Sequence, residues 1–350
     1  MRLVKLTDIV GYEKLARSVM TPDYHELLAA GSILKPEYVS KLEQLGITEV
    51  LIDDTKLKPE QVQILREDVE DLFREKVRSV LERHVYNNNA ELEELSKTAD
   101  RIITEILEDD NVIEQIFDLR ERSADIYEHS ISVCSLAVLV AAKLGQPKKE
   151  LHNIGVASLF HDIGLRYLDF SYTNRTIEEM SEKERIEYKK HPAYAFSSFE
   201  KEKWLSKESK LMILQHHERL DGSGYPLHTR NLSLQSEILA VTDVFDEMIC
   251  GIGCKRTKVY EAVEFLKVAK GIKFSEEVVE VLLDFTAVYP AGSLVMLNTG
   301  EVGVVVRQNR QFPERPILRI VKDAQGKPLE GEKFCDLLDV HTIYIEKVIM

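Results

Sequence analysis

The sequence predicts a mostly α-helical protein with a small α+β unit at its N-terminus and a short β-rich segment at its C-terminus. Apolar residues recur at three- and four-residue spacing through most of residues 59–289, which is the period of amphipathic helices. Short strand-like runs come before that region, and β-branched runs around a glycine come after it. The chain has 350 residues, of which 44% are hydrophobic and 30% charged, so it can bury a sizeable core.

Residues 1–58 are predicted to form the small α+β domain, with a regulatory or dimerisation role suggested only by its place in the chain. Two strand-like runs lie within 14–34, on either side of a polar turn. A short helix is predicted over 35–46, because a proline lies near its start and a glycine at its end. The run 48–52 follows as a strand.

Residues 59–122 are predicted to be a helical linker and the start of a helical bundle. Two charge-rich amphipathic helices are expected over 60–85 and 90–110, interrupted by the asparagines 87–89. Their charged faces are interpreted as solvated surface over a packed stripe, and a homodimer contact is the alternative.

Residues 123–290 form the predicted main domain, and they contain the best apolar run of the chain, 131–145. This run is too short to span a bilayer, so we expect a core helix and no membrane span. Residues 291–350 are predicted to be β-rich, with a hairpin at Gly300 between β-branched runs.

The net charge of −14 argues against a partner such as duplex nucleic acid or an anionic membrane, which clustered Lys and Arg would bind. A small anionic substrate at a locally positive site remains compatible with it. The four cysteines form no CxxC pair and are expected to be reduced. The N-terminal residues lack the apolar stretch of a signal peptide, so a cytoplasmic location is expected.

Five of the ten histidines lie in one region, at intervals of 32, 30 and 25 residues followed by an adjacent pair. Each interval is about the length of a helical hairpin, so helices packed side by side could bring these imidazoles together. They are His129, His161, His191, His216 and His217.

Two aspartates accompany the histidines. Asp162 directly follows His161, and Asp243 lies among apolar residues, where an unpaired charge would be costly. Seven nitrogen and oxygen donors exceed the three or four of one zinc site and suit two metals, with Asp162 as a bridge. A donor set without thiolates favours iron, manganese, cobalt or nickel as readily as zinc, and we expect iron or manganese.

Two divalent cations would leave this region positively charged despite the acidic chain, and would attract an anionic phosphodiester. Such a metal pair lowers the pKa of a bridging water and stabilises both the attacking and the leaving oxygen.

The motifs HDIG at 161–164 and HHERLDGSGYP at 216–226 resemble the HD-GYP family. This family is the branch of the HD metal-dependent phosphohydrolases that cleaves cyclic di-GMP. The resemblance covers about residues 123–289, and the segment from Tyr289 also resembles the one that comes after the catalytic domain in many members. It implies an HD-type helical bundle and a catalytic domain over 123–290.

The resemblance also implies a ligand set. One metal would be bound by His129, His161, Asp162 and Asp243, and Asp162 would bridge to a second metal held by His191, His216 and His217. His161, Asp162 and Asp243 would therefore be the catalytic residues. Some members hold a third metal through an acidic residue that corresponds to Asp125, and a helix cap is the alternative role for this residue.

The sequence also offers candidates for contacts with the substrate. Arg219, Tyr225, Lys255 and Arg256 are candidates for contacting phosphate or guanine. The family resemblance also gives the loop that contains Gly222 and Gly224 a role in binding partners such as GGDEF-type proteins. Leu165 stands where the family usually has a lysine that contacts substrate phosphate.

These expectations add up to a metal-dependent cyclic di-GMP phosphodiesterase that produces pGpG, and GMP if cleavage continues. Two alternatives stay open: a receptor or scaffold that binds the dinucleotide without useful catalysis, which Leu165 motivates, and a hydrolase for another cyclic dinucleotide.

Overall fold

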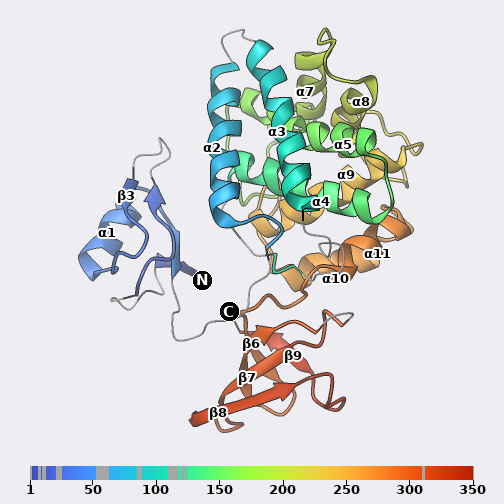
Figure 1. The fold of residues 1–350 in the computed structure, drawn as a ribbon. Helices are drawn as coiled ribbons and strands as arrows, with labels where there is room; N and C mark the ends of the chain where they lie inside the picture. The colour runs from blue at the N-terminus through green and yellow to red at the C-terminus, as the bar shows by residue number, and fades with distance from the viewer. Residues whose placement is uncertain are drawn as a thin grey trace. The chain divides into compact units, whose positions relative to one another are not determined.

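The computed structural model describes residues 2–6, 9, 13–20, 26–52, 63–84, 89–108, 117–119, 122, 124–309 and 312–349. The chain divides into two compact units, one formed by Val62–Tyr289 and the other by Met1–Gln61 with Pro290–Met350. The first unit is helical, and the described parts of the second are an α+β segment and a β-sheet (Figure 1). The predicted fold class is confirmed.

The described part of the N-terminal segment contains two small antiparallel sheets and one helix. Strand β1 (Arg2–Lys5) pairs with β4 (Glu49–Ile52), and β2 (Val19–Met20) pairs with β3 (Glu26–Leu28). Helix α1 (Pro36–Gln44) has its proline in the first turn, where the missing N–H has no helical partner anyway. The sequence predicted α1 and β4 correctly, but the strand β1 was missed.

The described residues of the helical unit form α-helices and two short 3₁₀ segments. Their bounds are α2 Glu67–His84, α3 Asn89–Leu107, α4 Ile126–Lys143, α5 Lys148–Phe160, η3 Ile163–Tyr167, η4 Ile177–Glu179, α6 Glu182–Tyr188, α7 His191–Phe199, α8 Lys207–Gln215, α9 Leu234–Cys250, α10 Val259–Ala269 and α11 Glu276–Asp284.

Helix α4 is the central helix of this unit and packs against α5 and α9. It begins at an Asp125 N-cap and is buried on almost every face between Glu128 and Ala141. Among the described helices, α4 is the one long and apolar enough to cross a membrane by composition, but it lies mostly inside the protein core. The prediction of a core helix around 131–145 is therefore confirmed.

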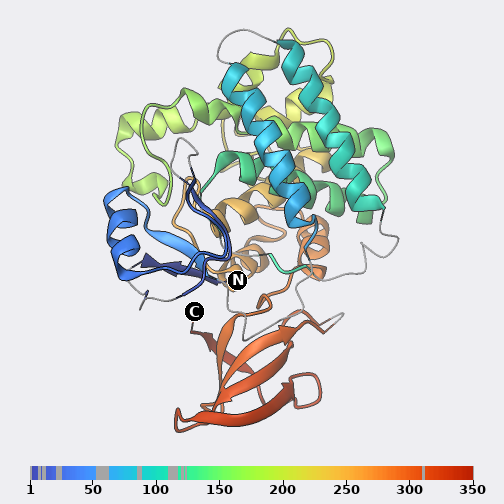
Figure 2. The same ribbon diagram turned by 60° about the vertical axis from the view of Figure 1, so that its left-hand side comes forward.

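Helices α2 and α3 run side by side (Figures 1 and 2). Each contributes an apolar stripe, which includes Phe73 and Val77 of α2 and Leu92 and Leu95 of α3, to the same core as α4 and α5. The helical unit therefore runs from residue 62, and the helices predicted as a linker and bundle start share one hydrophobic core with the residues after 123.

The C-terminal segment is an antiparallel sheet with the strand order β8-β7-β6-β5-β9 (Figure 2). The hairpin predicted at Gly300 joins β5 to β6, and this glycine has a φ of 82°, which favours a residue without a side chain. The strands are β5 Leu294–Leu297, β6 Val302–Arg307, β7 Ile317–Lys322, β8 Pro328–Asp336 and β9 Ile345–Val348.

Candidate metal centre

The seven predicted donors come together inside the helical unit, at the ends of some helices and within others. His129 lies in α4 and Asp243 in α9, whereas His191 is the first residue of α7. The pairs His161–Asp162 and His216–His217 directly follow α5 and α8. Each of the seven residues has at most 4% of its surface exposed, so the cluster is almost completely removed from water.

The first group of donors consists of His129, His161, Asp162 and Asp243. Nε2 of His129 lies 3.1 Å from Nε2 of His161 and 3.2 Å from Oδ1 of Asp243. Oδ2 of Asp162 lies 3.4 Å from the same nitrogen of His129. Ligand atoms about 2.1 Å from one metal ion lie roughly 3.0–3.4 Å apart at octahedral or tetrahedral angles, so these separations fit one cation.

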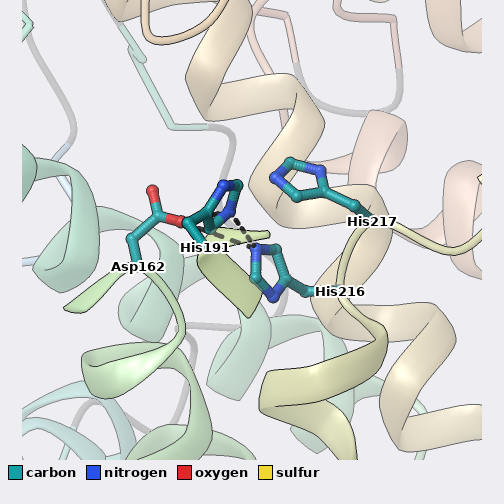
Figure 3. Close-up of side chains that lie close together, drawn as sticks. All are labelled: Asp162, His191, His216 and His217. Atoms are coloured by element: carbon teal, nitrogen blue, oxygen red, sulfur yellow. Dashed lines mark hydrogen bonds and ion pairs between the residues drawn. The ribbon is translucent and has the colours of Figure 1, made fainter. Parts of the chain in front are cut away.

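The second group consists of Asp162, His191, His216 and His217, whose side chains converge in Figure 3. Oδ1 of Asp162 lies 3.2 Å from Nε2 of His191 and 3.5 Å from Nε2 of His216. The two imidazole nitrogens are 3.1 Å apart. Asp162 therefore directs one carboxylate oxygen to each group, which is the arrangement of a ligand that bridges two cations.

The orientation of four histidines is fixed by hydrogen bonds from their other ring nitrogen. Nδ1 of His161, His191 and His216 each lies 2.7 Å from a backbone carbonyl oxygen, of Ser158, Tyr188 and Ile213 respectively. A carbonyl can only accept, so Nδ1 carries the proton and Nε2 presents its lone pair to the centre. Nδ1 of His129 likewise lies 2.7 Å from Oδ2 of Asp246. This is the pattern by which metal-binding histidines are oriented.

The residues fit a divalent metal site by a second criterion. Both oxygens of Asp162, Oδ2 of Asp243 and Nε2 of His217 are buried without a hydrogen-bond partner among the described residues. A buried acceptor without a partner costs free energy, and four of them in one place need a common explanation. A divalent cation would coordinate these atoms directly and remove that cost.

Comparison with known proteins agrees with this geometry. A family model described as an HD domain matches residues 90–278, more than half of the chain. The protein belongs to the HD domain family. A second model, described as a KOW domain associated with the HD domain, matches residues 294–350, which contain the C-terminal sheet.

Two curated relatives align with much of the length of this HD domain protein. A cyclic di-GMP phosphodiesterase of Pseudomonas aeruginosa is 27% identical over 245 residues, which cover 69% of this chain and 59% of the relative. A cyclic di-GMP phosphodiesterase of Thermotoga maritima is 28% identical over 273 residues, which cover 71% of this chain and 67% of the relative. The chain thus spans about two-thirds or less of the length of these relatives.

A solved structure shares the fold. The HDGYP protein Bd1817 of Bdellovibrio bacteriovorus aligns with a TM-score of 0.55 at 18% identity, over 81% of this chain and 98% of that one. Together with the curated relatives, this neighbour confirms the resemblance to the HD-GYP branch that the two sequence motifs predicted.

Opposite charges offset the effect of burial in the centre of the HD domain. Burial by itself would raise the pKa of Asp162, but the imidazoles of His161 and of three further histidines close to it hold the pKa well below its ordinary value. Burial would lower the pKa of His129, but the neighbouring carboxylates of Asp162, Asp243 and Asp246 raise it instead. The lowered pKa of Asp162 favours the ionised carboxylate that cation binding requires.

Asp246, Ser132 and Arg122 were not predicted from the sequence to take part in the site. They fix the orientation of the His129 ring. Asp246 is fully buried and accepts a hydrogen bond from Oγ of Ser132 at 2.6 Å, in addition to its contact with His129. The guanidinium of Arg122 pairs with the same carboxylate. Burial opposes the charged form of Arg122, yet Asp246 and Glu128 raise the pKa of the guanidinium above its ordinary value. Arg122 and Asp246 thus form a buried ion pair that holds the imidazole of His129 in place.

The loop after His217 is anchored by Glu218, a second residue that was missed. Its carboxylate is fully buried and accepts hydrogen bonds from the backbone N–H groups of Leu227, His228 and Thr229. Gly224 packs directly on this turn, because a Cβ atom there would lie 2.4 Å from the carbonyl oxygen of His217. The loop therefore folds back over the metal centre rather than extending away from it.

Gly164 and Leu165 both have packing roles in the 3₁₀ segment η3, which comes after the end of α5 at Phe160. A Cβ atom at Gly164 would lie 2.0 Å from the backbone oxygen of His191, so the glycine permits close packing of η3 on α7. Leu165 is 1% exposed and packs in an apolar cluster with Met180 and Tyr188.

The structure places the remaining predicted residues around the centre. Asp125 is in neither donor group; its carboxylate accepts hydrogen bonds from the N–H groups of Tyr127 and Glu128, as the helix-cap alternative predicted. Tyr225 stacks on the ring of His217, with centroids 4.6 Å apart.

The three basic candidates take part in internal contacts. Arg219 donates hydrogen bonds to the carbonyl oxygens of His216 and Glu218 and lies over the ring of Phe274. Lys255 is exposed and pairs with Glu179 at 2.9 Å. The backbone N–H of Arg256 donates to Asn174. Their contacts with a substrate stay predictions.

Proposed function

We propose that this protein is a metal-dependent phosphodiesterase that hydrolyses cyclic di-GMP to pGpG, with GMP as a later product if pGpG is also cleaved. The observation that carries the proposal is the carboxylate of Asp162, which directs one oxygen to each of two histidine groups. The names of the curated relatives support the choice of cyclic di-GMP as the substrate.

Divalent cations held by the two groups of donors would supply a nucleophile from water and stabilise the attacking and leaving oxygens of an in-line displacement. The chain's own residues would bind and orient these cations. Asp162 would be shared by the two positions, and His161 and Asp243 would complete the first of them. The hydrogen bonds from Nδ1 keep the imidazoles turned with Nε2 towards the centre, so they need no reorganisation when the substrate arrives.

We propose iron or manganese as the metal in both positions. The donors of both groups are imidazole nitrogens and carboxylate oxygens, a set that iron and manganese accept as well as zinc does. We also propose that bulk water is largely excluded from this site, because the centre is buried behind the loop of residues 218–230.

Substrate contacts are proposed for four residues: Arg219, Tyr225, Lys255 and Arg256. Tyr225 is the best supported, because its aromatic ring stacks on His217 of the metal centre and aromatic rings can also stack on a guanine base. The same proposal includes a GGDEF-type partner that binds at the loop of residues 222–226, and a homodimer. It also includes a cytoplasmic location and a regulatory role for residues 1–58.

One observation favours a second function, that of a cyclic di-GMP receptor without useful catalysis. Leu165 replaces the lysine that the family usually directs at the substrate phosphate, and it is buried among apolar side chains. A receptor would bind the dinucleotide and leave it intact.

Hydrolysis of cyclic di-GMP by protein loaded with iron or manganese under reducing conditions separates the two functions. The phosphodiesterase proposal expects pGpG to accumulate with the wild-type chain and not with Asp162→Asn. Tight binding by calorimetry, with the nucleotide unchanged after long incubation and the metal positions filled, would instead support the receptor. Parallel assays with other cyclic dinucleotides identify the preferred substrate.

A further inference from the structure

Lys189 lies between the two helices that bring His191 to the metal centre. It directly follows α6, and its backbone N–H donates a hydrogen bond to the carbonyl oxygen of Arg185. The carbonyl oxygen of Tyr188, the residue before it, accepts the hydrogen bond from Nδ1 of His191. The main chain of Lys189 is therefore held in a fixed place beside the second group of donors.

The ammonium group of Lys189 lies over an aromatic ring that contacts the centre. Its Nζ is 5.5 Å from the centroid of the Tyr225 ring, and the same ring stacks on the imidazole of His217 with centroids 4.6 Å apart. A single aromatic ring thus lies between the ammonium and one of the seven donors. A contact between a cation and a ring is weak at an exposed site, so a phosphate can draw the ammonium away from it.

Lys189 differs from two basic residues in the same region, because no carboxylate among the described residues pairs with it. Nζ of Lys190 lies 2.6 Å from Oε1 of Glu187, and Nζ of Lys255 lies 2.9 Å from Oε2 of Glu179. The side chain of Lys189 is also exposed. Its positive charge is therefore available to an anion that comes from outside the chain.

A cyclic dinucleotide needs such a charge, because it contains two phosphodiester groups. The phosphate that is cleaved would bind at the cations, and the other lies across the ring of the dinucleotide, away from them. This second phosphate keeps its negative charge in a protein whose own net charge is −14. Leu165 offers it no cation, since its side chain is apolar and buried.

We propose that Lys189 binds the phosphate of cyclic di-GMP that is not cleaved. The ammonium moves from the ring of Tyr225 to a phosphate oxygen and forms a charge-assisted hydrogen bond there. Lys189 thus supplies, from another part of the fold, the positive charge that Leu165 lacks. The inference rests on the proposed function, because it needs a cyclic dinucleotide at the metal centre.

Steady-state kinetics of the metal-loaded full chain test this role. Lys189→Gln should raise the KM for cyclic di-GMP by about 10-fold or more and change kcat much less, because a contact of equal strength in the ground and transition states is lost. Lys189→Arg keeps the charge and should restore most of the affinity. The matched control is Lys190→Gln, which removes the neighbouring lysine that pairs with Glu187 and should keep the wild-type KM.

A second substrate separates phosphate binding from damage to the metal centre. Bis(p-nitrophenyl) phosphate contains one phosphodiester, which would bind at the cations. Its KM as a substrate, or its Ki as a competitor, should therefore be the same in the wild type and in Lys189→Gln. A disturbed metal centre would instead weaken binding of both compounds by the same factor.

Three results would overturn the proposal: an unchanged KM for cyclic di-GMP in Lys189→Gln, an equal rise in Lys190→Gln, or an equal loss for bis(p-nitrophenyl) phosphate. If the wild type cleaves cyclic di-GMP and Lys189→Gln matches it, only the role of Lys189 fails. If the wild type binds the dinucleotide without cleaving it, the proposed function fails. Affinities from calorimetry then decide the role of Lys189, with the same 10-fold ratio expected. A wild type that neither binds nor cleaves the dinucleotide overturns both.

Discussion

Oδ2 of Asp246 lies 2.7 Å from Nδ1 of His129, and this contact connects the metal centre to a buried ion pair with Arg122. The carboxylate fixes which ring nitrogen carries the proton, and therefore which one faces the cation. His129 is the one member of the first group whose orientation depends on a side chain, since His161 is held by the carbonyl oxygen of Ser158. The geometry of the first position is thus sensitive to a residue that touches no metal.

Asp246→Asn should weaken metal binding while the fold is retained. An amide has nearly the same shape, but it lacks the charge that stabilises the protonated Nδ1 of His129, and such changes typically lower metal affinity by about 10- to 100-fold. Titration of apo-protein with Mn²⁺ measures the effect. Ser132→Ala, which removes one hydrogen bond to the same carboxylate, is the control and should change affinity much less. Equal affinity in wild type and Asp246→Asn would contradict the positioning role.

Glu218→Gln should loosen the loop after the paired histidines without changing the metal content. The substitution replaces charge-assisted hydrogen bonds to three backbone N–H groups, each worth about 1.5–3 kcal/mol, by weaker neutral ones. Hydrogen exchange should therefore accelerate at residues 227–229. Asp221→Asn serves as the control, because its one hydrogen bond to the N–H of Ser223 lies at the surface. Unchanged exchange at 227–229 would show that Glu218 does not anchor this loop.

Leu165→Lys should destabilise the protein rather than restore the family's phosphate contact. The leucine is 1% exposed in an apolar cluster, so an ammonium group there is buried without a carboxylate partner or must force the cluster apart. We expect a loss of about 3 kcal/mol or more in the free energy of unfolding, against less than about 1.5 kcal/mol for Leu165→Met. Denaturant unfolding gives both values. A stable Leu165→Lys variant with a lower KM would mean that position 165 can reach the substrate.

Removal of the metals with a chelator should lower the melting temperature but leave the helices folded. The hydrophobic core of the helical unit extends from α2 to α11 and does not depend on the centre. A ligand present at about 100 times its Kd stabilises by about 2.7 kcal/mol, which corresponds to a shift on the order of 5–10 °C in a unit of this size. Thermal melting followed by circular dichroism checks both points, and complete unfolding on chelation would show that the metals are structural instead.

The seven central donors could be predicted from the sequence because the histidines recur at intervals of about one helical hairpin and match two family motifs. Asp243 had a further signal, since it lies between Thr242 and Val244 in a helix that is buried along most of its length. The spacing of the histidines indicated helical hairpins, but it could not show which oxygen of Asp162 faces which group. That detail depends on where the donor-bearing ends of α5, α7 and α8 lie in space relative to one another.

The residues that were missed act through contacts that sequence spacing reveals only in part. Asp246 lies three residues after Asp243, so a shared helix face was a usable signal. Glu218 gave no such signal, since its partners at 227–229 are brought back by the turn of the loop. The packing role of Gly164 could not be predicted either, because its neighbour, the backbone of His191, is distant in the sequence.

Anomalous diffraction from crystals of protein purified without oxygen and loaded with iron or manganese tests the central claim most directly. We predict strong peaks on both sides of the Asp162 carboxylate, roughly 3.5–4 Å apart, with the histidines of each group around them. A map in which the metal-loaded crystals show no peak within bonding distance of Asp162 would contradict the account.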